Sequence, residues 1–271
     1  MPDQLTARSP CGVQSTETAD RPGGSRCLSD PPDLPPSLAV FRAQYRANVV
    51  GRFYNGFLHL AFIVLASSFI IALFLSFVRN PTWLDWLCIP ATFIAANFVE
   101  YLGHRGPMHK LFRWLGLMFR RHTHEHHRFF TDEWMTCRSQ RDFKIVLFPP
   151  AMLFFYLGIV AFPIGLGLYL FHTWNTACLY VATATFYFMS YEVLHFCYHL
   201  DENSWAARLP VIRALRAHHR AHHRLALMNR YNFNITWPIA DFCFGTIYRE
   251  ETKDGKSRSG DRQEIDSTPQ P

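Results

Sequence analysis

The feature that most constrains this chain is a run of 47 residues, 145–191, without a single Asp, Glu, Lys or Arg. A helix needs about 20 mainly apolar residues to cross the hydrocarbon core of a bilayer. The run is therefore too long for one crossing and fits two, with a turn expected around residues 171–175. Pro149, Pro150 and Pro163 are expected to bend or break its first half. Buried helices of a soluble protein rarely tolerate such a run, which favours a membrane protein.

Two shorter apolar spans precede this run. Residues 57–78 carry no charged side chain and stop at the turn signal Arg79–Pro81. Residues 83–102 contain only Asp85 near their start and Glu100 near their end. The pattern predicts an all-α integral membrane protein with four transmembrane helices arranged as two hairpins.

The two ends of the chain differ in composition from the middle. Residues 1–37 hold seven of the 17 Pro, with Gly, Ser and Thr, which predicts a disordered N-terminal tail. Residues 251–271 are predicted to form a flexible C-terminal tail, so the membrane domain should span residues 38–250. The seven Cys follow no paired spacing, which argues against a disulfide framework and a zinc ribbon.

Basic residues lie on one side of the predicted spans. The formal net charge is +6, and Lys and Arg are concentrated before the first span, between the second and third, and after the fourth. The two short opposite loops hold only Arg79. The positive-inside rule therefore places both termini and the long loops in the cytoplasm, with the protein in a bacterial inner membrane or the endoplasmic reticulum. This placement of charge fits a membrane surface better than a nucleic acid.

Ten of the 14 His form four spaced groups at the predicted cytoplasmic ends of the spans. H-x4-H follows the second span, H-x3-HH comes next, H-x3-H ends the fourth span, and H-x2-HH follows it. On an α-helix, residues three and four apart share a face, so the last two groups each point their imidazoles in one direction. A single such pair is usually two unrelated surface or core histidines, but four groups at one membrane face predict a metal site. The candidate ligands are His104, His109, His122, His126, His127, His195, His199, His219, His222 and His223.

Ten imidazoles exceed the needs of one transition-metal ion, so we predict two ions with about five nitrogens each. His104 and His109 are five residues apart, and we expect them to straddle a helix end and the following turn. In the second group, the i, i+4 spacing to His126 favours His122, and His124 stays the alternative. The remaining four histidines are expected to be bystanders: His59, His124, His172 and His218. His124 and His218 adjoin candidate ligands and are the alternatives to them.

These groups on a four-span scaffold resemble the fatty acid hydroxylase superfamily, which includes sterol desaturases and sphingolipid fatty acid 2-hydroxylases. The similarity covers about residues 50–250. It includes residues 231–248, which resemble the family's N-[FY]-G…P-x-x-D…FGT signature through Asn232, Phe233, Pro238, Asp241 and Phe244–Thr246. Two positions depart from the family pattern. Thr123 makes the second group H-x3-HH instead of the commoner H-x2-HH, and Asn234 stands where Gly is usual.

The resemblance implies a cytoplasmic helical cap with a non-haem dimetal centre, which uses O2 and two electrons to hydroxylate a lipid C–H bond. Two iron ions are the implied cofactors, with zinc able to fill the site in purified protein, and the ten histidines are the implied ligands. No catalytic side chain beyond them is expected. The chain has no haem, flavin or iron–sulfur motif, so an electron-transfer protein such as a cytochrome b5 or a ferredoxin is the expected partner. The basic face at Arg113–Arg141 is expected either to bind this carrier or to anchor the domain at the membrane surface.

Other functions fit parts of the pattern. A sterol or acyl desaturase, or a carotenoid hydroxylase, would use the same site. A membrane metal-binding protein or transporter is disfavoured, because transporters place ligands near the bilayer midplane. Ligating histidines usually donate their second N–H to a carboxylate or carbonyl, and Glu192, three residues before His195, is the favoured carboxylate. The other candidates for that role are Glu100, Glu125, Asp201 and Asp241.

Overall fold

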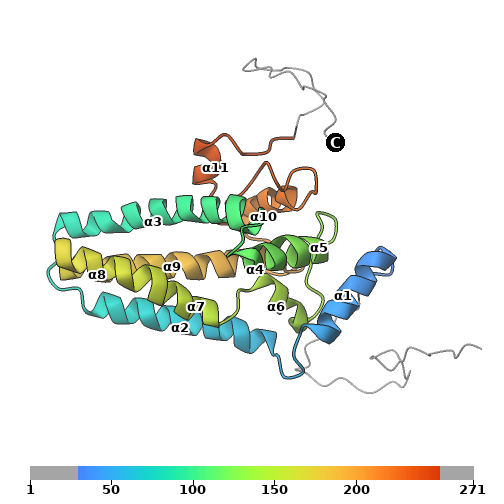
Figure 1. Ribbon diagram of the computed structural model, residues 1–271, viewed down its shortest axis with the longest axis horizontal. Coiled ribbons are helices and arrows are strands. Elements are labelled where there is room, and N and C mark those ends of the chain that lie inside the picture. Colours follow the sequence, from blue (N-terminus) through green and yellow to red (C-terminus); the bar gives the residue numbers. More distant parts are fainter. Residues whose placement is uncertain (1–29, 251–271) are drawn as a thin grey trace, which may run out of the picture.

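The computed structural model describes residues 30–250, and every regular element in this part of the chain is a helix. Figure 1 shows a long bundle and a head of shorter helices at one end of it. The bundle contains α2 (Gly56–Ser76), α3 (Trp83–Gly103), α7 (Ala151–Tyr156), η4 (Leu157–Ala161), α8 (Phe162–Phe171) and α9 (Trp174–Tyr198). The head contains α1 (Pro36–Asn48), η1 (His104–Met108), α4 (Gly116–Phe119), η2 (Arg120–His126), α5 (His127–Phe129), η3 (Gln140–Asp142), α6 (Phe143–Val146), α10 (Pro210–His222) and α11 (Ile239–Cys243).

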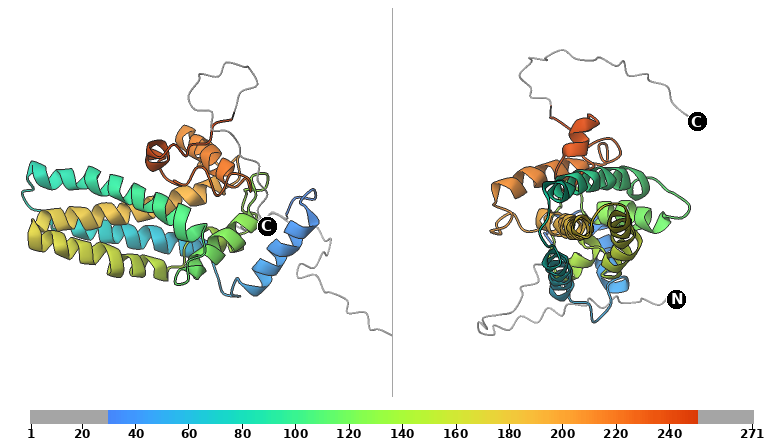
Figure 2. Two further views of the ribbon diagram at one scale, coloured as in Figure 1. Left: turned by 45° about the horizontal axis from the view of Figure 1, so that its top comes forward. Right: turned by 90° about the vertical axis from the view of Figure 1, so that its left-hand side faces the viewer.

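Four helical segments are long and apolar enough to cross a membrane, which confirms the predicted all-α fold with four spans. α9 is the central span and packs against α2, α3 and α8 (Figure 2). In its most apolar window 67% of the residues are buried inside the protein, against 17% for α2 and for α3. The outer spans expose large apolar side chains such as Leu65, Phe69 and Val99, as expected of a surface that faces lipid.

The end of the bundle away from the head is closed by side-chain caps. Thr82 and Asp85 form a capping box at the start of α3, with an Asp85 oxygen 2.7 Å from the Thr82 amide nitrogen. Asp85 also accepts a hydrogen bond from Thr176 of α9 at 2.7 Å. The Asp85 carboxylate therefore links the start of α3 to the start of α9. The predicted turn at 171–175 is confirmed, since α8 ends at Phe171 and α9 begins at Trp174.

The third span is interrupted where its prolines predict. The helix stops after α6, and the chain is extended at Leu147 before it restarts at Ala151, directly after Pro149 and Pro150. Pro163 causes no break, because the π-helical turn η4 precedes it and it occupies the first turn of α8. The interruption at 147–150 lies beside the head and opens one wall of the site described below.

The head is held to the bundle by an aromatic core, and ion pairs hold segments of the head together. Phe129, Phe130 and Phe143 are buried in a cluster with Phe196 of α9. Asp142 is fully buried, and its carboxylate lies 2.7 Å from the guanidinium Nε of Arg46.

Part of the predicted N-terminal tail belongs to this folded head. Residues 30–37 are described, with Leu34 buried and Asp30 paired to both Arg42 and Arg46, so the folded part begins before the expected boundary at residue 38. Residues 1–29 and the C-terminal tail at 251–271 lie outside the described residues.

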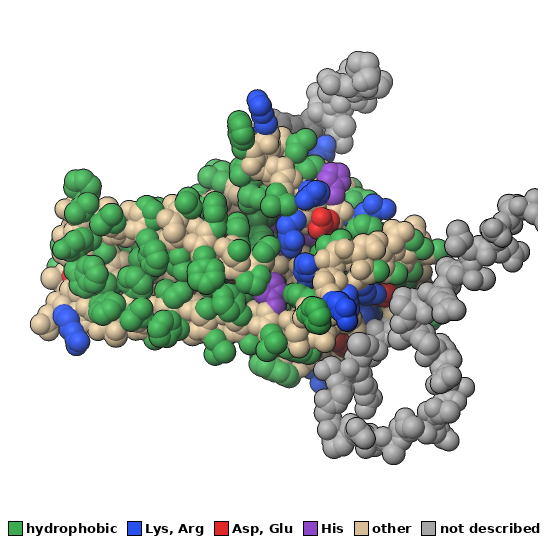
Figure 3. Space-filling model, turned by 60° about the horizontal axis from the view of Figure 1, so that its bottom comes forward, with side chains coloured by type: hydrophobic (Ala, Val, Ile, Leu, Met, Phe, Trp, Pro, Cys, Tyr) green, Lys and Arg blue, Asp and Glu red, His purple; other side chains and the backbone are tan. Residues whose placement is uncertain are grey.

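Hydrophobic side chains cover the bundle, and Lys and Arg gather where the bundle meets the head (Figure 3). Both ends of the described chain, α1 and the segment after α11, belong to the head region (Figure 1). An even number of spans requires this, because each hairpin returns the chain to the side from which it started.

Candidate metal centre

The ten candidate histidines converge inside the head, and all of them are buried. Their nitrogens form two groups in which the possible ligand atoms lie within 4.8 Å of one another. His223 joins these groups: its Nε2 lies 3.0 Å from Nε2 of His219, and its ring centre lies 4.3 Å from that of His127. The first group is His104, His109, His122, His127 and His222, and the second group is His126, His195, His199 and His219.

Each group combines distant parts of the chain. The first group takes rings from η1, from η2 and α5, and from α10, whereas the second takes them from η2, from α9 and from α10. α10 and the η2–α5 segment contribute to both groups. The two groups therefore lie side by side and share their supporting helices.

The H-x4-H and H-x3-HH spacings work because the chain is π-helical at both places. On an α-helix, residues five apart point about 140° away from each other. In η1 the wider π turn, kinked at Gly106, brings the ring centres of His104 and His109 to 5.0 Å. In η2 it brings Nε2 of His122 and Nε2 of His127 to 3.1 Å. The expected helix end and turn at residue 104 is thus a kinked π-helical segment.

The structure distinguishes His122 from His124, the two alternatives within the H-x3-HH motif. His122 is buried, and its Nε2 lies 2.8 Å from Nε2 of His104. His124 is exposed and packs on the ring of Phe119, with ring centres 4.9 Å apart. The other bystanders also lie outside both groups: His59 contacts the Phe148 carbonyl, His172 contacts Thr176, and His218 contacts Asp241.

Backbone carbonyls orient five of the ten rings. Nδ1 donates to the Met135 carbonyl from His199 at 2.7 Å and to the Phe130 carbonyl from His223 at 2.7 Å. Because a carbonyl only accepts, Nδ1 carries the ring proton and Nε2 presents its lone pair to the centre. The same arrangement joins His104 to Phe233, His126 to Ile145, and His222 to Tyr231.

These lone pairs make a site that suits a cation. His104 and His222 both present an unprotonated Nε2 and belong to one group, and the same holds for His126 and His199 in the other group. Two such lone pairs cannot hydrogen-bond to each other. Protonation of these rings is unfavourable, because burial lowers the pKa of His223 to about 4 and the pKa of His199 and of His219 well below the usual value. An all-imidazole set fits transition-metal ions such as iron or zinc, so the residues present fit the implied dimetal group.

Among the described residues, none of the carboxylates predicted to orient the rings forms a hydrogen bond or ion pair with any of the ten histidines. Glu192 accepts instead from the Phe148 amide at 3.0 Å, next to the interruption of the third span. Glu125 lies 3.9 Å from Arg120, and Asp201 accepts from the amide of Asn203. The carbonyls take the role that sequence reasoning gave to Glu192.

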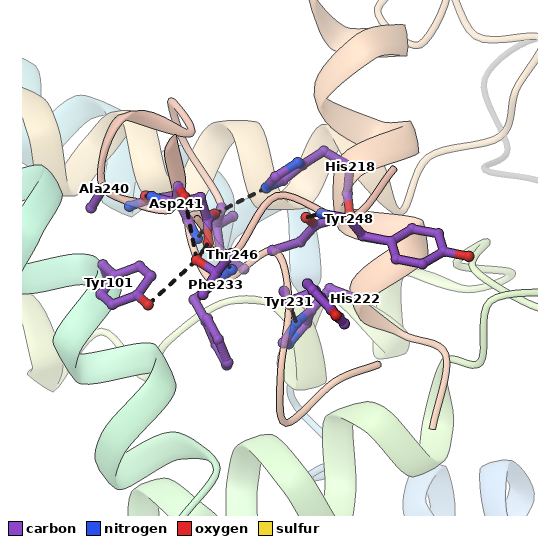
Figure 4. A network of polar contacts seen from close by, with 12 residues as sticks. Tyr101, His218, His222, Tyr231, Phe233, Ala240, Asp241, Thr246 and Tyr248 are labelled. Atoms are coloured by element: carbon purple, nitrogen blue, oxygen red, sulfur yellow. Dashed lines mark hydrogen bonds and ion pairs between the residues drawn. The ribbon is translucent and has the colours of Figure 1, made fainter. Parts of the chain in front are cut away.

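Asp241 and Glu100 hold the loop that supplies two of these carbonyls. Figure 4 shows the contacts of Asp241 within this loop. Asp241 accepts from the amides of Phe233 at 2.9 Å and Asn234 at 2.7 Å, and from the Thr246 hydroxyl at 2.7 Å. Glu100 accepts from the Thr236 amide at 2.9 Å. The loop held in this way presents the Tyr231 and Phe233 carbonyls to His222 and His104.

Asn234, which stands where the family pattern has Gly, forms hydrogen bonds that hold this loop. Its side-chain nitrogen donates to the Asn97 carbonyl of α3 at 3.0 Å, and its side-chain oxygen accepts from the Asp241 amide at 3.0 Å. In the described part of the chain, positive φ is found two residues earlier, at Asn232 (φ 58), and not at Asn234. Asn234 therefore adds bonds at this position without backbone strain.

One comparison with known proteins gave a match, to the model of a protein family. Neither a search of curated proteins nor a search of solved structures gave a match. The model of the family described as fatty acid hydroxylase matches residues 89–246, which include all ten histidines and the loop held by Asp241. The chain belongs to the fatty acid hydroxylase family.

Proposed function

We propose that this protein is a membrane-bound, non-haem di-iron oxygenase that uses O2 and two electrons to hydroxylate a C–H bond of a lipid. The observation that carries the proposal is the pair of adjacent all-histidine groups, buried at the ends of spans whose outer faces suit lipid. The ten histidines are the proposed ligands, two iron ions are the proposed cofactors, and zinc can occupy the same nitrogens.

When bound, two such ions supply the activation of O2 that amino-acid side chains lack. The chain's own residues hold and shield the site. Five of the ten histidine rings are oriented by carbonyls. Phe130, from the buried aromatic cluster, packs on the ring of His199 with ring centres 4.1 Å apart and covers that side of the site. Rigid donors of this kind keep the geometry of a site constant during reaction.

We propose that a small apolar cavity beside the histidines receives part of the lipid chain. It has a volume of about 100 Å³ and borders His122, His126 and His195. Its wall includes the interrupted stretch of the third span together with Met118 and Met152. A cavity lined by Met and aliphatic side chains suits a flexible methylene chain better than a polar substrate.

The electrons would come from an acidic carrier such as a cytochrome b5 or a ferredoxin. The outer face of α10 supports this, because the helix buries its candidate ligand histidines and exposes Arg213 and Arg220, while Arg216 is buried and paired with Glu202. Arg208, Arg213 and Arg220 are exposed there and line one groove. Complementary charge at such a face would guide an acidic partner to the helix that holds His219 and His222. This surface adds to the basic face expected at Arg113–Arg141.

Desaturation with the same site is the second candidate, and no described contact separates it from hydroxylation. A transporter remains disfavoured, because the histidines lie in the head at the ends of the spans and not at the middle of the bundle. The product distinguishes these functions, since hydroxylation adds one oxygen atom, desaturation removes two hydrogens, and transport changes no lipid.

The test is lipid mass spectrometry on cells that express the protein, on cells without it, and on cells that express a His126→Ala, His219→Ala variant. Under isotope-labelled O2, we expect one labelled oxygen atom in a lipid class only in the first cells. Unchanged lipids in cells whose purified protein is fully loaded with metal would refute the proposed reaction.

We also propose that the head and both termini face the cytoplasm, from the one-sided distribution of Lys and Arg. A reporter fused at the C-terminus should be active in the cytoplasm. Activity on the opposite side of the membrane would contradict this orientation.

A further inference from the structure

A second hollow lies next to the histidine cavity and is not used by the proposed metal centre. It is a cleft of about 560 Å³ between the start of α2, the start of α6, η2 and the interruption of the third span. This volume falls within the range of about 300–1,000 Å³ that is usual for ligand sites, whereas the histidine cavity alone is too small. Its lining includes Phe53, Leu58, Arg121, Lys144 and Pro149.

The two hollows are neighbours. Arg121 and Pro149 line both of them, so the cleft and the histidine cavity adjoin at these two side chains. The cavity beyond them is apolar and ends at His122, His126 and His195. One elongated molecule could therefore place one end in the cleft and the other beside the histidines.

The cleft contains two cationic side chains that other contacts leave available. Arg121 donates from Nη2 to the Lys144 carbonyl at 3.0 Å, and Lys144 donates from Nζ to the Val49 carbonyl at 2.8 Å. Both are partly buried, and within residues 30–250 neither has a carboxylate within ion-pair distance. Arg46, by contrast, is matched by Asp30 and Asp142. The spare donors in the cleft suit an anionic oxygen group.

The cleft also lies at the depth where lipid head groups are found. α2 begins at Gly56, so the residues before it lie at the polar boundary of the first span. Phe53 and Leu58 flank this boundary and are 87% and 69% exposed, as suits side chains that contact a membrane interface. A lipid could therefore enter sideways from the bilayer, with its head group remaining at the interface.

We infer that the substrate is an amphiphile with an anionic head group, a carboxylate or a phosphate, which binds Arg121 and Lys144 while its acyl chain enters the histidine cavity. This inference rests on the proposed function for calling the ligand a substrate. The head-group contact itself depends only on the cleft, so it can be measured without turnover.

The test uses the full chain in a neutral detergent and native mass spectrometry under competition. The probes are a saturated fatty acid, a monoacyl phosphate and a fatty alcohol of equal chain length. At least one anionic probe should bind about tenfold more tightly than the alcohol, as expected for charge-assisted hydrogen bonds. Preference for the carboxylate or for the phosphate identifies the head group, and either supports the inference.

Two matched variants locate the contact. Lys144→Met should reduce the anion preference several-fold, whereas Lys110→Met, an exposed lysine of the same head that lines neither hollow, should leave it unchanged. Arg121→Gln should reduce it further, and Lys144→Met decides the question if Arg121→Gln does not fold. Equal binding of the alcohol, or equal effects of the two lysine variants, would overturn the inference. Anion preference without an oxygenated product would refute the proposed function alone.

Discussion

Two segments of the head each supply three histidines to the centre, and they do so with different helices. α10 carries H-x2-HH on a regular α-helix, and His219, His222 and His223 all lie on its buried face. The η2–α5 segment carries H-x3-HH, with one more residue between its histidines, and is π-helical over Arg120–His126. The extra residue and the wider turn compensate, so the two segments deliver equivalent sets of rings.

The two segments also differ in what holds them in place. α10 buries Ile212 and Leu215 and needs no unusual backbone. η2 is tied by polar contacts: the Thr123 hydroxyl donates to the Met108 carbonyl at 2.6 Å, which links η2 to η1. π-helical turns have weaker intrinsic stability than α-helical ones, and such contacts can stabilise them. We therefore expect η2 to be the more sensitive segment.

The largest expected effect is loss of metal when a histidine inside the centre is removed from either segment. His126→Ala and His219→Ala should each lower the metal content and reduce oxygenation by about 100-fold or more, since each removes a nitrogen from the second group. His124→Ala is the matched control within η2, because that ring is exposed. Elemental analysis and product assays, both normalised to folded protein, measure the effect. Metal loss in His124→Ala equal to that in His126→Ala would show that the assignment within η2 is wrong.

The next largest effect should follow from a change of spacing. One Ala inserted after Ala221 gives α10 the spacing of η2, and on a regular helix it turns the following histidines by about 100°. We expect this protein to lose metal from both groups. Deletion of Thr123 gives η2 the spacing of α10, and it should retain more metal than the insertion because an α-helix suits that spacing. Equal metal loss in the two variants would contradict the link between spacing and helix type.

Asp241→Asn should have an intermediate effect through the loop that orients His104 and His222. We expect metal affinity to fall about 10- to 100-fold, the usual result of removing a group that supports metal ligands. Asp201→Asn is the matched control, since the Asp201 carboxylate accepts from the amide of Asn203 and contacts no histidine among the described residues. Titration of metal-free protein with Zn²⁺ measures both affinities. Equal values for the two variants would show that Asp241 does not support metal binding through this loop.

The smallest expected effect is that of Thr123→Val, which removes the hydrogen bond between η2 and η1. Loss of one such bond should destabilise the folded protein by about 1 kcal/mol, while Thr123→Ser should retain most of the stability. Thermal unfolding in a fixed detergent measures the difference. If Val and Ser variants unfold at the same temperature, this contact does not hold the π-helical segment.

The fold was largely predictable because bilayer thickness and backbone hydrogen bonding restrict an uncharged run of 47 residues to helices. The positions of the spans, the turn near Phe171 and the break at Pro149 and Pro150 all follow from local rules. The burial of Leu34 and the pairing of Asp30 with Arg46 do not follow from local rules, because they depend on tertiary contacts.

The candidate site was predictable in membership but not in geometry. Spacing selected the ten histidines that converge, including His122 over His124. The π-helical turns were missed, because an i, i+4 rule assumes α-helix throughout. The orienting carbonyls, such as that of Met135, were missed as well: every residue carries a carbonyl, so residue type gives no signal. The ligand role of these histidines stays a prediction.

The measurement that tests the central claim most directly is the number of metal ions bound per chain in the purified full-length protein expressed with excess iron. Native mass spectrometry can count them while the chain stays folded. The account predicts two ions per chain, because the histidines form two groups that share α10 and the η2–α5 segment. A folded, active protein that holds one ion or none would contradict it.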